Sequence, residues 1–185
     1  MKALVLSTAA VVAVAFTAGP APASVMSVGG PLSFNCYQAA DRSDARPSAI
    51  DSCTRALDEE NLLPADKAAT HVNRGIVYRL QSRAAAAESD FNQAIAIDPS
   101  LSEAWLNKAY LKLRQNRAQE ALPLIEKGLQ LGAQRPAMAY LARGLAHEDL
   151  GEVRQAYEDL AKARDLEPTW AEPGKYLARY SVHHP

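Results

Sequence analysis

The chain has 185 residues, and its 20 basic and 21 acidic residues leave a net charge of −1. This balance gives no electrostatic reason to expect binding to nucleic acid or to an anionic membrane. From Pro47 onward, the sequence lacks the alternating β-branched runs that are typical of strands, while alanine is abundant. Length and composition therefore favour one all-α domain with a core of its own.

The first 23 residues have the pattern of a secretory signal peptide. Lys2 supplies a basic start, residues 4–16 form an apolar run, and the tripeptide Ala-Pro-Ala at 21–23 matches a cleavage site. We therefore expect export to the periplasm or beyond, with residues 1–23 removed and a flexible leader at 24–32. A retained membrane anchor is the alternative, but a spanning helix needs about 20 apolar residues.

Four columns of residues recur at a constant spacing through the rest of the chain. Gly75, Ala109 and Gly144 are separated by 34 and 35 residues, and three further columns keep these spacings. They are Ala87, Ala121 and Ala156; Phe91, Ile125 and Leu160; and Ala94, Gly128 and Ala163. A period of this length indicates a repeat array. The extra residue is expected in the loop at 132–136.

Each repeat is predicted to form a helical hairpin. The small residue in the first helix lets the second helix approach closely, and the small–large–small column forms the buried seam of the second helix. Ser82, Asn116 and Gly151 stand at the turn between the helices, where a left-handed residue ends a helix. Pro99 and Pro168 follow the second helices, which proline cannot continue.

These hairpins resemble tetratricopeptide repeats. The stretch NRGIVYRLQSRAAAAESDFNQAIAIDP has that family's glycine, aromatic, alanine and proline positions, whereas Lys112 and His147 replace the aromatic residue in the next two copies. The resemblance implies an all-α fold, a right-handed superhelical array of helical hairpins. The repeats are expected at 68–101, 102–136 and 137–170.

Two further segments are expected to extend the array. The second-helix seam recurs around Cys53, so residues 33–67 are predicted to form a degenerate helical pair. Its spacing to the first full repeat places four extra residues in the loop around 58–67. Residues 171–185 are expected to form a capping helix and a tail, because a repeat array needs its last apolar edge covered.

Cys36 and Cys53 are the two cysteines of the chain, and an exported protein favours their pairing. Their separation of 17 residues equals that between Arg74 and Phe91. The resemblance implies that these two columns face each other across a hairpin. We therefore predict a Cys36–Cys53 disulfide with a structural role. The chain has no CxxC motif, which argues against a redox or metal-binding role.

Paired charges occupy one column of the first and third repeats. Asp90 follows Arg74 after 16 residues, and Asp159 follows Arg143 at the same distance. We expect an ion pair between the two helices of each of these hairpins. The second repeat has Leu124 in place of the aspartate. The alternative is a basic binding stripe along the first helices.

The sequence shows no constellation of catalytic, metal-binding or cofactor-binding residues. His71 and His147 lie in different repeats, and His183 and His184 lie near the end of the chain. No serine or cysteine has a histidine at an informative spacing, and no glycine-rich loop follows a strand. We therefore expect a protein that is not an enzyme and that uses no cofactor or metal ion.

The resemblance implies a peptide-binding groove lined by the first helices. The residues transferred to this groove are mostly apolar: Val72, Asn73, Ile76, Arg79, Leu106, Asn107, Tyr110, Leu113, Leu141, Leu145 and Glu148. Asn73 and Asn107 stand at positions where some relatives hold a C-terminal carboxylate, but the basic residues of that clamp are missing. An amphipathic helix or an extended apolar segment is therefore the expected ligand.

These expectations together describe a non-enzymatic scaffold or adaptor for another protein, without nucleic-acid binding or stable membrane insertion. Three alternatives stay open, because a large apolar surface is rarely left bare. The groove could be filled by the leader or the terminal helix of the same chain. It could instead mediate self-association of a structural protein, or carry a small hydrophobic ligand.

Overall fold

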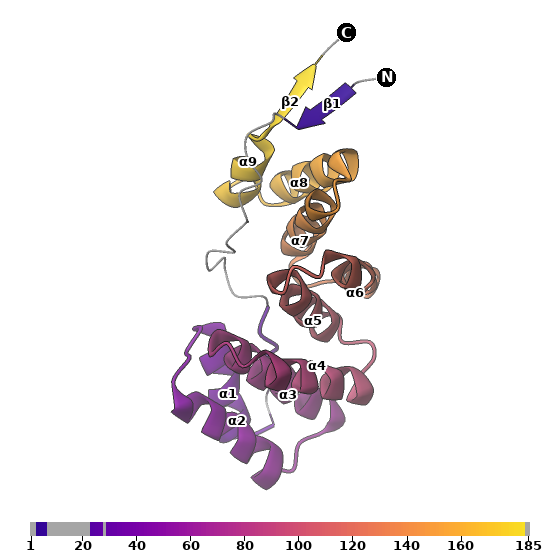
Figure 1. Ribbon diagram of the computed structural model, residues 1–185. Coiled ribbons are helices and arrows are strands. Elements are labelled where there is room, and N and C mark those ends of the chain that lie inside the picture. Colours follow the sequence, from indigo (N-terminus) through magenta and orange to yellow (C-terminus); the bar gives the residue numbers. More distant parts are fainter. Residues whose placement is uncertain (1–2, 7–22, 28, 184–185) are drawn as a thin grey trace.

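The computed structural model describes residues 3–6, 23–27 and 29–183. Within them the chain forms nine α-helices and two short strands (Figure 1). In chain order the elements are β1 (Ala3–Leu6), α1 (Pro31–Asp41), α2 (Pro47–Glu59), α3 (Pro64–Leu80), α4 (Ala84–Ile97), α5 (Ser102–Arg114), α6 (Ala118–Gln130), α7 (Pro136–Asp149), α8 (Val153–Leu166), α9 (Ala171–Leu177) and β2 (Tyr180–His183).

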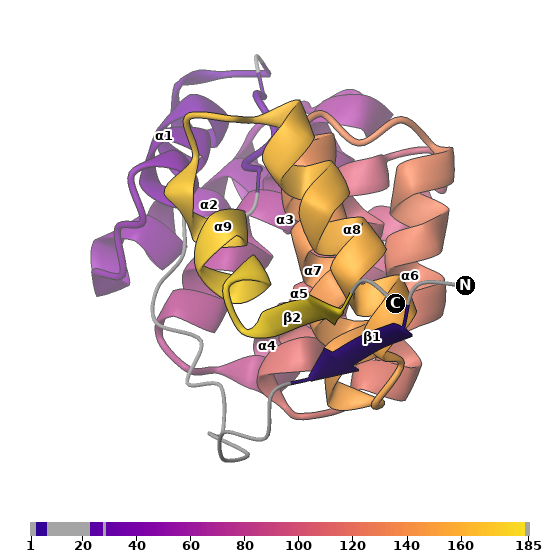
Figure 2. The ribbon, with the colours of Figure 1, turned by 90° about the horizontal axis from the view of Figure 1, so that it is seen from above.

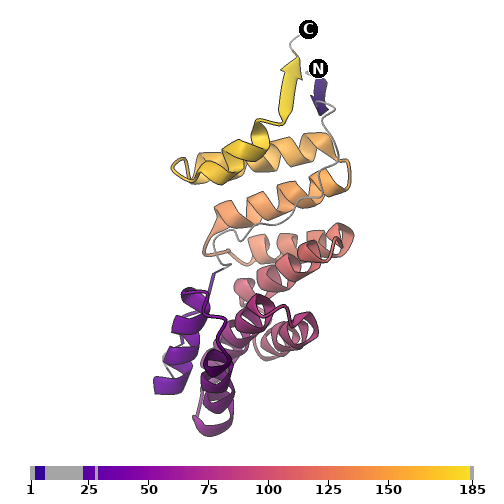
Figure 3. The ribbon, with the colours of Figure 1, turned by 60° about the vertical axis from the view of Figure 1, so that its left-hand side comes forward.

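The helices form pairs that stack one upon the next. Helix α1 packs on α2, α3 on α4, α5 on α6 and α7 on α8, and each pair contacts the pair that follows (Figures 1 and 3). The first helices also contact one another, α3 with α5 and α5 with α7, so they share one side of the stack. The all-α repeat fold predicted from the sequence is confirmed.

Some of the described helices begin with a proline, whose missing N–H costs nothing at that position. Four of them have a proline in the first turn, namely α1 at Pro31, α2 at Pro47, α3 at Pro64 and α7 at Pro136. The start of α1 is also bound by Glu60, whose carboxylate accepts hydrogen bonds from the backbone N–H groups of Leu32 and Ser33 at 2.7 and 3.0 Å. These bonds satisfy helix donors that have no partner within the helix.

The turn inside each full hairpin has one residue in the left-handed conformation. Its φ is 60° at Ser82, 57° at Asn116 and 75° at Gly151. These are the three positions predicted to end the first helices. Ser43, with a φ of 54°, has the same role between α1 and α2. The first pair therefore turns in the same way as the full repeats.

Small residues let the two helices of a hairpin touch. A Cβ atom added to Gly75 would lie 2.5 Å from the Phe91 ring, and one added to Gly144 would lie 3.0 Å from Leu160. Phe91, Ile125 and Leu160 are completely buried at this contact. The recurring columns of the sequence are therefore the seam that joins the two helices of each pair.

Helix α3 is longer than the first helices that follow it. It has 17 residues, against 13 in α5 and 14 in α7. The extra residues upstream of the first full repeat were expected in a loop around 58–67. They instead lengthen α3 at its start, because Pro64 opens the helix directly after a short connection from α2.

The two ends of the chain meet in a small sheet that the sequence analysis did not anticipate. Helix α9 packs on α8, and β2 then pairs antiparallel with β1, with Ala3 opposite His183 (Figure 2). Strand β1 belongs to the predicted signal peptide, whose remaining residues and most of whose cleavage motif lie outside the described residues. Among those described, no helix has the length and apolar character that crossing a membrane requires.

Cys36 of α1 and Cys53 of α2 form the predicted disulfide. Both residues are completely buried, and their buried neighbours in these two helices include Ala40, Ala49 and Ala56. Alanine side chains bury little apolar area, so this pair of helices has a weak hydrophobic core of its own. The covalent bond compensates by restricting the unfolded chain.

Removing this bond should destabilise the protein. The double substitution Cys36→Ala with Cys53→Ala is expected to lower the free energy of unfolding by about 3 kcal/mol. Urea denaturation of the full chain, followed by circular dichroism, measures the difference. Thiol labelling of the native parent chain provides the control and should find neither cysteine reactive. Two reactive thiols in the native protein would contradict the disulfide.

Candidate functional site

The charged column of the first and third repeats forms ion pairs within the hairpins. Arg74 donates from Nε and Nη2 to the Asp90 carboxylate at 2.8 and 2.9 Å. Arg143 donates from the same two atoms to Asp159 at 2.7 Å. Both aspartates are buried. The predicted ion pairs are therefore present, and these arginines brace the hairpins instead of forming a free basic stripe.

Two histidines also contact carboxylates in the first and third hairpins. His71 Nδ1 lies 2.9 Å from Asp90 Oδ1, and His147 Nδ1 contacts the Glu152 carboxylate. In the second repeat, the buried Lys112 binds Glu88 at 2.6 Å, which explains why a lysine can replace the usual aromatic residue. Within the described residues, no group of three or more His, Cys, Asp or Glu side chains could hold a metal ion.

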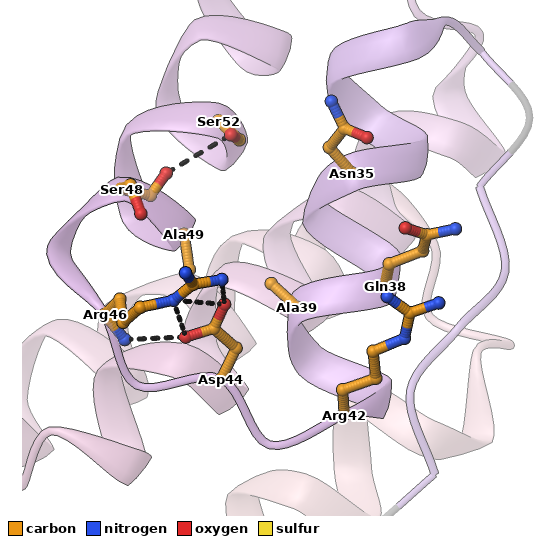
Figure 4. Close-up of a pocket in the computed structure, with 9 residues that line it drawn as sticks. All are labelled: Asn35, Gln38, Ala39, Arg42, Asp44, Arg46, Ser48, Ala49 and Ser52. Atoms are coloured by element: carbon orange, nitrogen blue, oxygen red, sulfur yellow. Dashed lines mark hydrogen bonds and ion pairs between the residues drawn. The ribbon is translucent and has the colours of Figure 1, made fainter.

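A polar cleft lies between α1 and α2 (Figure 4). It is lined by Asn35, Gln38, Ala39, Arg42, Asp44, Arg46, Ser48, Ala49 and Ser52. Arg46 donates to both carboxylate oxygens of Asp44, and this hydrogen bonding lowers the pKa of Asp44 to about 2. Because these two charges neutralise each other in an open cleft, we look for the functional site elsewhere.

The predicted groove residues fall into two classes. Those that are buried are Val72, Asn73, Ile76, Leu106, Asn107, Leu113 and Leu145. Those that are half-buried are Arg79, Tyr110, Leu141 and Glu148. Most of the apolar members thus pack into the core, and the expected open apolar groove is much reduced. The polar members become the distinctive feature of this face.

Residues 23–27 of the same chain lie on this face as an extended segment. The Val25 N–H donates to Asn73 Oδ1 at 3.0 Å, and Asn73 Nδ2 donates to the Val25 carbonyl at 2.7 Å. One buried asparagine therefore binds both polar groups of a single residue's backbone. This contact holds main chain and does not depend on the side chain that the segment carries.

The side chains of the bound segment alternate between buried and exposed, as in a β-strand. Val25 and Ser27 are 9% and 0% exposed, whereas Met26 between them is 63% exposed. Val25 packs into the core cluster that contains Val72 and Ile76. Residues 24–27 of the predicted flexible leader are therefore held in place, and the alternative that the chain fills its own groove applies to this stretch.

Asn107 occupies the same position one repeat later, but its side chain makes fewer good hydrogen bonds. Its Nδ2 donates to the Glu103 carbonyl at 2.8 Å and reaches the Ala23 carbonyl only at 3.5 Å. Its Oδ1 is buried without a hydrogen bond. A small gap remains here, lined by Ala23, Asn107, Tyr110 and other residues of the second and third repeats. The leader thus uses only one of the two asparagines fully.

Comparison with known families identifies the repeat. Residues 68–101 and residues 91–122 each match a model described as tetratricopeptide repeat. A comparison with curated proteins finds no match. The chain therefore contains tetratricopeptide repeats.

Solved structures with the same fold include a MamA fragment from Desulfovibrio magneticus RS-1. It aligns with a TM-score of 0.64 and 21% identity over 80% of this chain and 83% of that chain. The first repeat domain of Spaghetti (RPAP3), bound to the HSP90 peptide SRMEEVD, has a TM-score of 0.59 and 23% identity over 62% and 90%. The second repeat domain of human RPAP3, in complex with the HSP70 peptide SGPTIEEVD, has a TM-score of 0.59 and 22% identity over 63% and 97%.

Removal of the buried aspartate should cost more in the first repeat than in the third. Asp90→Ala removes the carboxylate that Arg74 and His71 share and is expected to lower the free energy of unfolding by about 3–5 kcal/mol. Asp159→Ala is the matched comparison. It should cost less, because the Arg143 side chain is 26% exposed against 18% for Arg74. Urea denaturation at pH 7 measures both losses.

The loss of stability caused by Asp90→Ala should also depend on pH. Burial raises the pKa of Asp90, but hydrogen bonds from Arg74 and His71 outweigh it, so the pKa lies below its ordinary value of 3.8. A lowered pKa contributes stability that is fully present above 3.8 and is lost as the pH falls through the folded-state value. The cost of Asp90→Ala should therefore shrink in acid below that point. A cost that grows as the pH falls below 3.8 would contradict the ion pair.

Proposed function

We propose that this chain is a non-enzymatic scaffold whose concave face binds an extended segment of another polypeptide. The observation that carries the proposal is the double hydrogen bond between Asn73 and the backbone of Val25. Because it reads main chain alone, a foreign segment in the same conformation would be held in the same way. The peptide complexes of the two RPAP3 domains support this class of ligand.

The leader has the properties of a replaceable occupant. It leaves Asn107 Oδ1 buried without a donor, although buried polar groups in proteins are nearly always paired. A partner segment that satisfies both asparagines would gain a hydrogen bond that the leader lacks. The leader is tethered to the groove, so its effective concentration there is in the millimolar range. A partner must therefore bind tightly enough to displace it.

Because Asn73 binds an extended backbone, we propose an extended segment as the ligand rather than an amphipathic helix. The half-buried residues Arg79, Tyr110 and Leu141 are then the candidates to contact its side chains, whereas Glu148 already pairs with Arg179 at 3.2 Å. A carrier of small hydrophobic molecules is less well supported, because Val72 and Leu106 already pack within the core. Self-association would follow if the leader of one copy entered the groove of another, and the oligomeric state tests this.

Export of the protein is part of the proposal. It is supported by the cleavage pattern at 21–23 and by the Cys36–Cys53 disulfide, since such bonds persist in oxidising compartments. Cleavage after Ala23 would leave residues 24–27, including the Val25 contacts, in the mature chain.

Expression of the full sequence in a bacterium tests export directly. Mass spectrometry of the protein from the periplasmic fraction should show a chain that begins at Ser24. An uncleaved chain of 185 residues confined to the cytoplasmic fraction would refute this part of the proposal.

A peptide-binding experiment tests the groove. The substitution Val25→Pro in the full chain removes the N–H that Asn73 accepts and so weakens the hold on the leader. A fluorescent peptide, Ala-Pro-Ala-Ser-Val-Met-Ser, should then bind this variant more tightly than the unsubstituted chain, measured by fluorescence anisotropy. Adding Asn73→Ala should weaken binding by about tenfold, because two hydrogen bonds are lost.

The matched control is Asn92→Ala, the same chemical change at an exposed position of α4. It should leave peptide affinity unchanged. Circular dichroism of each variant checks that the helices are intact, and light scattering reports any exchange of leaders between copies. Equal affinity with and without the Asn73 side chain would defeat the proposed groove.

A further inference from the structure

Arg79 differs from the other arginines near the concave face. Its Nε and Nη2 atoms are buried and have no hydrogen bond. By contrast, Arg74 and Arg143 each bind an aspartate, and Arg135 lies 3.5 Å from Glu167. A buried guanidinium without a partner is costly, and such groups in proteins are usually paired.

The charge of Arg79 persists in spite of its burial. Desolvation, with Arg114 nearby, lowers the pKa of Arg79 to about 10, so the side chain is still protonated at neutral pH. Arg114 adds a second positive charge instead of neutralising the first. This part of the groove therefore presents uncompensated positive charge.

Arg79 lies on the same helix as Asn73, the residue that holds the bound segment. It is in the last turn of this helix, α3. Burial raises the pKa of the Tyr110 hydroxyl, and the nearby charges of Arg135 and Arg79 oppose this rise. Tyr110 in turn lines the gap next to Ala23. Residues 23–27, Ala-Ser-Val-Met-Ser, bring no carboxylate to this charge.

The ion pairs inside the hairpins show which kind of ligand fits the unpaired atoms of Arg79. Arg74 and Arg143 bind carboxylates with Nε and Nη2, the same two atoms that Arg79 leaves unused. This edge of the planar guanidinium matches the two oxygens of a carboxylate and forms two parallel hydrogen bonds.

We propose that Arg79 is a carboxylate-binding subsite of the groove, which pairs with an Asp or Glu side chain of the bound segment. The inference rests on the proposed function and adds the chemistry of the partner: an extended segment with an acidic residue close to the residue that Asn73 holds. The neutral leader occupies the main-chain site but brings no carboxylate to Nε and Nη2 of Arg79, so an acidic partner has an advantage over it.

A double-mutant cycle between protein and peptide tests the subsite. The probes are acetylated and amidated peptides based on Ala-Pro-Ala-Ser-Val-Met-Ser, with Glu placed at each position in turn and with Gln at the same position as the uncharged counterpart. Binding to the full chain carrying Val25→Pro is measured by competition. At one position Glu should bind about tenfold more tightly than Gln, and Arg79→Gln should abolish that difference.

Arg154→Gln is the matched control, because it removes the same charge at an exposed position on α8. It should leave the preference for Glu intact. The cycle compares ratios of affinities within each variant, so a modest loss of stability in Arg79→Gln does not disturb it. An unamidated neutral peptide separates the two sources of a carboxylate, the side chain and the chain terminus.

The outcomes separate the two proposals. If neutral peptides bind through Asn73 but Glu gives no advantage at any position, the subsite is overturned and the groove stands. If the unamidated neutral peptide alone shows an Arg79-dependent gain, the side-chain assignment is overturned. If no peptide binds any variant, the proposed function fails, and the subsite fails with it.

Discussion

The close contact between the two helices of each hairpin is the constraint on which the rest of this structure depends. At Gly75 there is no room for a Cβ atom beside the Phe91 ring, and Gly144 meets Leu160 in the same way. A single hairpin of this kind cannot bury its apolar side chains alone, so it must stack on its neighbours. Stacking at a constant offset then brings α3, α5 and α7 to one side. The face that we propose to bind a partner is a consequence of that stacking.

The repeat places equivalent residues at equal steps along this face, and their different hydrogen bonding distinguishes them. Asn73 makes two hydrogen bonds to residues 23–27, and its equivalent Asn107 makes one long hydrogen bond to them. In a neighbouring column, Nε and Nη2 of Arg79 have no hydrogen bond. In the hairpin interior the same chemistry is complete, since Arg74 and Asp90 satisfy each other. Buried polar groups are usually paired, and the unsatisfied ones are the basis of the proposal that a partner segment displaces the leader.

Local patterns predicted the elements well because each depends on residues close in sequence. The turns at Ser82, Asn116 and Gly151 followed from the need for a left-handed residue after a helix. The Cys36–Cys53 bond followed from a hairpin spacing that the full repeats share. The pairing of β1 with β2 could not be foreseen, since it joins the two ends of the chain and neither short strand has a periodic signal. The start of α3 was misjudged because extra residues in a helix and in a loop look alike in an alignment of repeats.

The sequence by itself determined the repeat and its hairpins, because periodic spacing dictates which side chains share a helix face. Its resemblance to tetratricopeptide repeats implied the disulfide and the residues of the concave face. It also named Asn73 and Asn107 as members of that face. Only the tertiary structure decided that Val72 and Ile76 are buried there, that Val25 covers them, and that Arg79 lies buried without a partner. The Val25 contact joins residues 23–27 to a helix that is distant in sequence, and such a contact cannot be predicted from periodic spacing.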